Sequence, residues 1–301
     1  MPTNTLNFGN LLLPILRKVY GDAYAEYTEE YSTIFEMDTS DRAYEEDQSI
    51  TTLGLVPVKE EGKSVDYDTF YQGYKKRYTH ITLGLGFIVT RELFEDAQYR
   101  NIRNMPKALA RSVRHTIEIY GANVLNNAFD TTNYPGSDAV SLCNSSHPLV
   151  GGGTMSNMPQ IAADLDITSY EQALIDISLN YVDDRGLKIL ARPKKMIIHP
   201  ANSFQAQMIL KSSGLPDTAN NNMNPAMGTM PGGITELHWL TDPDAWFIQT
   251  DVPNGLVWIW RRRPEFTQDN DFDSDNAKYK TTYRASQGFT DFRGVYGSAG
   301  A

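Results

Sequence analysis

The fold of this chain is decided by the stretch from Asn104 to Phe129, which reads NMPKALARSVRHTIEIYGANVLNNAF. Its apolar residues recur every three or four positions over about six turns, the period of an amphipathic α-helix. They are Met105, Leu109, Val113, Ile117, Tyr120, Val124 and Ala128. We expect Asn104 to cap the helix and Pro106 to lie in its first turn. A helix of about 25 residues is roughly 37 Å long, far above the mean, so we predict that it is the spine of the molecule.

A strand and a charged segment are expected on the N-terminal side of this helix. Residues 81–89 alternate in side-chain type, which predicts a half-buried strand. Residues 41–79 are rich in charges of both signs, and Val65 to Tyr71 alternate with the period of a strand. We therefore predict that residues 41–79 form a long β-hairpin that projects from the fold. About forty residues with nothing local to pack on are unusual in a compact domain, which favours docking elsewhere.

The first forty residues predict a helix that starts at about Leu11. Most residues of its apolar stripe are tyrosines: Leu12, Leu16, Tyr20, Tyr24, Tyr27 and Tyr31. A tyrosine ring has an apolar face and a polar tip, which suits the surface between two subunits better than a dry core. An ordinary amphipathic helix that packs on its own domain is an equally good explanation.

The second half of the chain predicts helices and strands in alternation. Residues 126–160 are turn-rich, and Thr168 with Glu171 forms a capping box before a helix. Residues 200–213 predict another helix. The expected strands are residues 187–191, 195–199, 237–240, 246–250, 256–260, 279–285 and 288–295. The chain is therefore assigned to the α+β class.

Charge and composition exclude several classes of protein. The formal net charge of −10 argues against a protein whose main task is to grip nucleic acid, because phosphates require a basic surface. The single Cys143 excludes a disulfide framework within the chain and a multi-cysteine zinc site. No stretch has the length of apolar sequence that a membrane span needs, and no leader peptide is recognisable, so we expect a protein that is not secreted.

Candidate chemical sites are weak, and we predict no catalytic, cofactor-binding or metal-binding residues. His147 and His199 each precede a proline, and with Cys143 their spacing matches no zinc signature. The two glycines of Gly84 to Gly86 lead into an apolar strand and not into a helix N-terminus, so they do not form a phosphate-binding loop.

Two groups of charged residues suggest contacts of a different kind. Asp269, Asp271 and Asp273 predict a solvated acidic loop, which could meet the basic residues of a neighbour's hairpin. Lys107, Arg111 and Arg114 lie on one side of the long helix. Such runs are mostly solvated faces, but these three residues could face the interior of a shell and touch DNA without sequence preference.

Two stretches resemble the major capsid proteins of tailed bacteriophages with the Hong Kong 97 fold, closest in style to the Mu-type major head subunits. One runs from Lys59 through Leu83-Gly84-Leu85-Gly86-Phe87-Ile88-Val89-Thr90-Arg91-Glu92-Leu93 to Tyr99. The other is Ser145-Ser146-His147-Pro148 with the downstream residues 165–213. The resemblance implies five segments: an N-terminal arm at 1–40, an extended β-hairpin loop at 41–82, a peripheral domain at 83–158 with its spine helix at 104–129, an axial domain at 159–251, and C-terminal strands at 252–301 that return to the peripheral domain.

On this resemblance the chain is a major capsid protein without enzymatic activity. It would assemble into the hexamers and pentamers of an icosahedral shell around double-stranded DNA, in the cytoplasm of a bacterial host. The residues expected between subunits are Tyr20, Tyr24, Tyr27, Tyr31, Lys59, Glu61, Lys63, Lys75, Lys76, Arg77, Asp269, Asp271 and Asp273. Expected partners are a portal protein, a separate scaffolding protein because no long scaffolding segment precedes the arm, and a decoration protein.

Two rival functions remain open from the sequence. The first is an encapsulin-like compartment, which has the same fold but encloses cargo protein in place of DNA. The second is an α+β enzyme that uses His147 and the Asp183-Asp184-Arg185 region.

Overall fold

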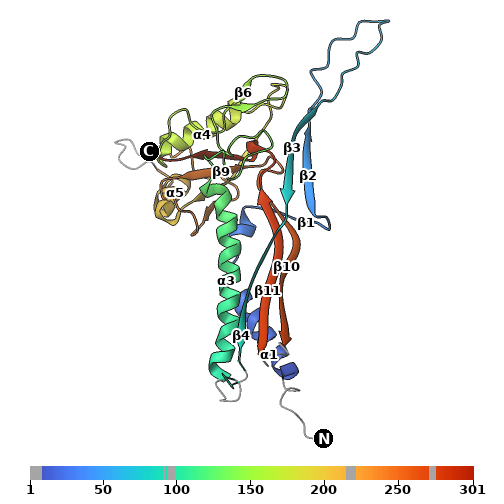
Figure 1. Cartoon of the computed structure of the whole chain (residues 1–301). Coiled ribbons are helices and arrows are strands. Elements are labelled where there is room, and N and C mark those ends of the chain that lie inside the picture. The colour runs from blue at the N-terminus through green and yellow to red at the C-terminus, as the bar shows by residue number, and fades with distance from the viewer. Residues whose placement is uncertain (1–8, 91, 94–98, 215–221, 271–275) are drawn as a thin grey trace.

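The computed structural model describes residues 9–90, 92–93, 99–214, 222–270 and 276–301. The molecule is elongated: a long helix and a long sheet run side by side, a smaller α/β part lies at one end of them, and a hairpin projects past that end (Figure 1). The N-terminal helix lies at the opposite end, whereas the C-terminus lies in the smaller part.

The predicted spine helix is present as α3, Tyr99–Asn126, and its 28 residues correspond to about 42 Å. The predicted cap was wrong, because the helix begins before Asn104 and has Pro106 in its interior. A proline there has no N–H for the carbonyl group one turn earlier, so that hydrogen bond is lost. The buried side of the helix consists of the predicted apolar stripe, with Leu109, Val113 and Ile117 almost fully covered.

A four-stranded sheet packs beside α3, in the order β1-β10-β11-β4. Its strands are β1 (Glu36–Thr39), β4 (Ile81–Val89), β10 (Val257–Asn270) and β11 (Ala277–Gly288). The short β1 runs parallel to β10, and the other neighbours are antiparallel. The N-terminal helix α1 (Gly9–Glu26) packs on α3, and the short 3-10 helix η2 (Tyr31–Thr33) leads into β1. The strand at 81–89 was correctly predicted, but most of its residues are exposed.

The projecting hairpin consists of β2 (Tyr44–Ile50) and β3 (Gln72–Thr79), which pair antiparallel. The prediction of a strand over Val65 to Tyr71 was wrong, because residues 51–71 form neither helix nor strand. Regular pairing stops at Ile50 and Gln72, beyond which the chain runs free of the body. A two-stranded ribbon is marginal in water without a surface to pack on, which explains why it ends there.

The smaller part contains a second four-stranded sheet in the order β12-β9-β7-β8. Its strands are β7 (Pro193–Ile198), β8 (Ile234–Glu236), β9 (Trp246–Thr250) and β12 (Val295–Ser298). Its helices are α4 (Ile167–Asn180), η3 (Pro200–Asn202), α5 (Ser203–Lys211) and η4 (Phe292–Gly294). The two-residue strands β5 (His147–Pro148) and β6 (Thr154–Met155) lie in the turn-rich segment. Because β12 pairs with β9, the last strand does not return to the first sheet as predicted.

Several predicted boundaries in this part were wrong. The capping box of α4 is made by Asp166 and Ser169, and not by Thr168 and Glu171. The expected strand at 187–191 is reduced to one isolated bridge at Lys188. No strand occupies 237–240, because β8 ends before it. The strand expected at 288–295 is interrupted by η4.

Candidate assembly surfaces

The hairpin ends in an irregular loop, residues 51–71, which we call the distal loop. Its apolar side chains are far more exposed than those of a folded core: Val56 is 95% exposed, Val58 94% and Tyr67 94%. Such a concentration of apolar surface marks a contact site in a soluble protein. The predicted residues Lys59, Glu61 and Lys63 lie exposed at the tip of this loop.

The basic residues at the base of the hairpin are already engaged within the chain. The ammonium group of Lys75 lies 2.5 Å from the carboxylate of Glu46 on the opposite strand. The guanidinium of Arg77 stacks 3.6 Å from the centre of the Tyr44 ring. Lys76 points inward and donates to the carbonyl oxygen of Pro135, and burial lowers its pKa. Because all three side chains already have partners in their own chain, these contacts argue against the prediction that they bind the acidic loop of a neighbour.

That acidic loop is only partly described. Asp271 and Asp273 lie outside the described residues. Asp269 is exposed and pairs in register with Lys278 on the adjacent strand.

The distal loop is fastened to a turn of the smaller part. The guanidinium of Arg185 pairs with the carboxylate of Asp68 and donates to the carbonyl oxygen of Thr69 at 2.6 Å. The hydroxyl of Thr52, on the other limb of the loop, donates to Asp183. The hydrogen bonds from Arg185, together with two backbone N–H groups, lower the pKa of Asp68 to about 2. Both limbs of the distal loop are thus attached to the same turn, at Asp183 and Arg185, and the tip of the loop between the limbs is exposed.

The tyrosines of the N-terminal segment divide into buried and exposed rings. Tyr20 is buried and stacks on Phe266 with ring centres 5.0 Å apart. Tyr31 is buried against Trp258 at 4.8 Å. These two rings therefore offer no free surface to a neighbour in the single chain. Tyr27, at 37% exposed, still does. The helix thus packs on its own domain, the alternative that the sequence left open.

A buried polar junction joins this N-terminal segment to the spine helix. Glu118, on α3, is 4% exposed, and its two carboxylate oxygens accept the backbone N–H groups of Glu30 and Tyr31 at 3.1 and 2.9 Å. Desolvation, with a smaller contribution from the nearby Glu30, raises the pKa of Glu118 to about 7, although the two backbone hydrogen bonds and Arg114 act in the opposite direction. Glu30 also binds the Nδ1 of His238 at 2.6 Å, which ties the smaller part to the same place.

One turn before Glu118, Arg114 belongs to the same junction. Its guanidinium pairs with Glu29 at 2.6 Å, donates to the carbonyl oxygen of Tyr24 at 3.0 Å, and stacks 3.9 Å from that ring. Arg114 is 4% exposed, so the expectation that it faces DNA beside Lys107 and Arg111 is corrected. The sequence held a sign of this junction: Arg114 and Glu118 are charged residues one turn apart, next to the apolar positions of the helix.

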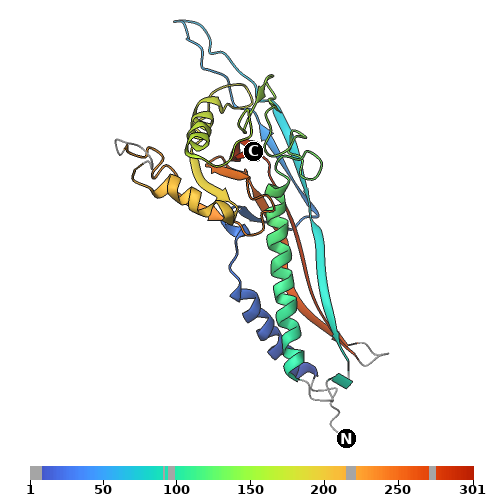
Figure 2. The same cartoon turned by 90° about the vertical axis from the view of Figure 1, so that its left-hand side faces the viewer.

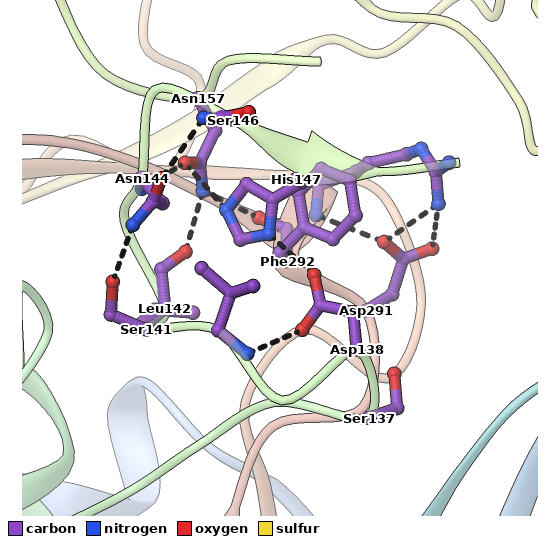
Figure 3. A network of polar contacts seen from close by, with 12 residues as sticks. Ser137, Asp138, Ser141, Leu142, Asn144, Ser146, His147, Asn157, Asp291 and Phe292 are labelled. Atoms are coloured by element: carbon purple, nitrogen blue, oxygen red, sulfur yellow. Dashed lines mark hydrogen bonds and ion pairs between the residues drawn. The ribbon is translucent and has the colours of Figure 1, made fainter. Parts of the chain in front are cut away.

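A second buried network surrounds His147, which has no exposed surface (Figure 3). Its Nδ1 lies 2.6 Å from the carboxylate of Asp138, and its Nε2 lies 3.1 Å from the side-chain oxygen of Asn157. The amide nitrogen of Asn157 donates to three backbone carbonyl groups, which fixes which of its atoms is the oxygen. The Nε2 of His147 therefore donates to Asn157, and its Nδ1 shares a hydrogen bond with the buried carboxyl group of Asp138. The ring of Phe292 stacks on the imidazole at 3.7 Å.

Of the groups named for an enzyme, Asp183 and Asp184 line a pocket, whereas His147 is buried away from it. A pocket of about 200 Å³ lies between the hairpin and the His147 network, but His147 does not line it. Its acidic residues are occupied: Asp183 by Thr52, and Asp184 and Asp291 by the buried Arg293, at 2.8 and 3.2 Å. Among the described residues no group of three acidic, histidine or cysteine side chains could hold a metal ion. Nor is any helix in the described part long and apolar enough to cross a membrane.

The fold is shared with subunits of solved protein shells. A virus-like particle from Pyrococcus furiosus has a TM-score of 0.56 at 11% identity, over 95% of this chain and 98% of that chain. The procapsid of bacteriophage JBD30 has a TM-score of 0.54 at 14% identity, over 97% of this chain and 75% of that chain. The capsid of an empty GTA particle has a TM-score of 0.57 at 12% identity, over 88% of this chain and 87% of that chain. The chain therefore has the Hong Kong 97 fold.

The family follows from the sequence itself. The family model for phage capsid protein matches residues 73–298, three quarters of the chain. No curated protein sequence matches. The chain belongs to the phage capsid protein family and is a major capsid protein, a structural component of a virion.

Proposed function

We propose that many copies of this chain assemble as hexamers and pentamers into a closed icosahedral shell around the double-stranded DNA of a tailed phage. The family match supports this function, and the exposed apolar residues of the distal loop are the observation that carries it. A loop of this kind gains its stability from burial between chains. Because each subunit contributes several contacts at once, weak individual contacts add up to a stable shell.

The five segments implied by the resemblance are the framework of this proposal. The extended loop (41–82) reaches a neighbouring subunit, with Lys59, Glu61 and Lys63 at its tip. The N-terminal arm (1–40) packs on its own domain through Tyr20 and Tyr31, and its exposed Tyr27 contacts the neighbour. The peripheral domain contains α3 and the long sheet, and the loops of the axial domain meet at the five-fold and six-fold axes.

The proposal includes contact between the shell interior and DNA. Lys107 and Arg111 are exposed on α3, and Arg103 is exposed one turn before Lys107. The spacing of four residues places the three cations on one side of the helix. Cations in such a row contact phosphates without reading sequence.

Electron microscopy of the purified protein tests the function. Shells with hexameric and pentameric units are expected, on their own or together with a scaffolding protein, and particles from infected cells should protect DNA from nuclease. Shells that contain protein cargo and no nucleic acid would instead support an encapsulin-like compartment. A chain that remains monomeric with every neighbouring gene product would refute the proposal. A portal protein, a decoration protein and assembly in the bacterial cytoplasm belong to the same proposal.

A further inference from the structure

The hairpin of β2 and β3 is attached to the body of its own subunit at its base and again further out. At the base, Tyr78 of β3 is 3% exposed, and its hydroxyl shares a 2.7 Å hydrogen bond with the hydroxyl of Thr290. Tyr78 also packs with Val257 and Ile259 of the long sheet in a small apolar cluster. Further out, Arg185 of the smaller part binds the distal loop. The hairpin is therefore joined to the long sheet at its base and to the smaller part beyond it.

A pocket separates the hairpin from the body between these two attachments. It has a volume of about 200 Å³, and the hairpin lines it with Ser49, Ile50, Thr52 and Tyr74. Atoms beside a void have no packing partners on that side, so the hairpin can tilt here without separating a close-packed interface. The tilt is consequently limited by the outer attachment and not by packing along the hairpin.

Arg185 is the centre of the outer attachment. Its guanidinium pairs with Asp68, donates to the carbonyl oxygen of Thr69 at 2.6 Å, and lies 5.3 Å from the centre of the Tyr71 ring. Its side chain is only 17% exposed. A planar guanidinium with several donors fixes the direction of its partners as well as their distance. Arg185 thus sets the angle at which this limb of the loop leaves the body.

The turn that contains Arg185 is itself fixed to the smaller part. The Oδ1 of Asp183 accepts the backbone N–H of Arg185 at 2.9 Å. Asp184 pairs with the buried Arg293 at 2.8 Å, and its carbonyl oxygen accepts the backbone N–H of Gly151 at 2.7 Å. A Cβ atom at position 151 would lie 2.8 Å from the same carbonyl oxygen, so the two backbones are in close contact. The backbone of the turn therefore has a defined position in the subunit.

The loop beyond this attachment is a long lever. Figure 2 shows that it also continues past the smaller part when the molecule is turned by 90° from the view of Figure 1. From Thr52 to Glu60 an extended chain covers up to about 26 Å, at roughly 3.3 Å per residue. A tilt of about 10° at the attachment would then move the tip by up to about 4–5 Å. A shift of this size changes the direction in which the next subunit is bound.

We propose that Arg185 determines the curvature of the shell, and with it the shell's diameter, by fixing the angle at which the distal loop leaves its own subunit. This inference rests on the proposed function, because it assumes that the loop contacts a neighbour. A contact between two different surfaces repeats from subunit to subunit, and the assembly closes only when the rotation between them fits a closed form. One angle selects one closed shell, whereas a range of angles permits several.

Replacement of Arg185 by Met tests the proposal. R185M removes the ion pair and the hydrogen bonds to the loop, and D68A removes the carboxylate from the other side of the contact. For both variants we expect cryo-electron microscopy to show a spread of shell diameters at least twice that of the wild type, or sheets that do not close. The melting temperature of the free subunit should stay constant, because the contact lies outside the core.

The matched control is K188M. Lys188 is an exposed cation three residues after Arg185, and in the described part of the chain its side chain makes no hydrogen bond or ion pair with the loop. K188M shells should keep the diameter and the spread of the wild type.

The outcomes separate this inference from the proposed function. Wild-type diameters for R185M or for D68A, or an equal broadening in K188M, would overturn the role of Arg185 and leave the capsid function intact. R185M subunits that form no assembly of any kind would also overturn it, because Arg185 would then be needed for the contact itself and not for its angle. Absence of wild-type shells under every condition would instead refute the function.

Discussion

Replacing Glu118 by Gln should remove a loss of stability that the wild-type subunit undergoes between pH 5 and pH 8. Burial raises the pKa of Glu118 from 4.5 to about 7. Below pH 4.5 the group is protonated in both the folded and the unfolded chain. Between pH 4.5 and 7 the unfolded chain loses its proton first, so the free energy of unfolding falls as pH rises. The full effect above pH 7 is at most about 3 kcal/mol.

Gln cannot ionise, so E118Q should lack this loss, but its amide nitrogen cannot accept the backbone N–H that the second carboxylate oxygen accepts. Urea unfolding of the free subunit, followed by tryptophan fluorescence from pH 5 to 8, measures the difference. At pH 5 the variant should be less stable by about 1–3 kcal/mol, because one buried backbone N–H loses its acceptor. From pH 5 to 8 the stability of the variant should stay constant, while that of the wild type falls by up to about 3 kcal/mol. The control E26Q removes one charge from an exposed position at the end of α1 and should keep the wild-type pH dependence. Parallel curves for E118Q and wild type would show that Glu118 is ionised in the folded protein at pH 5, contrary to this reasoning.

Three further changes have defined outcomes. H147L leaves its buried aspartate partner without the hydrogen bond to the imidazole and should lower the free energy of unfolding by about 1–3 kcal/mol, measured by urea unfolding; an unchanged free energy would contradict a stabilising role of this hydrogen bond. R185M should speed protease cleavage within the distal loop while the melting temperature stays constant, and an unchanged cleavage rate would show that Arg185 does not fasten the loop. Replacing Arg103, Lys107 and Arg111 together by Gln should weaken the binding of assembled shell protein to DNA at low salt. The binding affinity should also depend less on salt concentration, and an unchanged salt dependence would show that these three cations do not contact phosphates.

Periodicity predicted the long elements well. The spine helix and the strand at 81–89 are present because a run of apolar residues with one period has one good way to be buried. The ends of helices were predicted less accurately, because the capping residue is decided by competition between local hydrogen bonds. Asp166 caps α4 because Ser169 bonds back to it, and the nearby Thr168 with Glu171 offered a pattern of the same kind.

Charged residues were the hardest to place from sequence. Arg114 looks like its exposed neighbours Lys107 and Arg111 on a helical projection, and only the packing of the N-terminal segment buries it. Tyr20 and Tyr31 could not be assigned to a core or a subunit contact, because the strands that cover them come from the far end of the chain.

The pairing of the long sheet also limits when the subunit can fold during its synthesis. β1 and β4 find their partners β10 and β11 only far later in the chain: Glu36 pairs with Val257, and Val89 pairs with Ala277. At about 5–20 residues per second, a ribosome needs on the order of ten seconds or more to supply them. Until then the edge of β4 and the apolar side of the spine helix stay uncovered, so a nascent chain would be a natural client for a chaperone. A chain that ends before residue 257 would lack the two central strands of the long sheet. Truncated products should therefore be unable to enter a growing shell and disrupt its assembly.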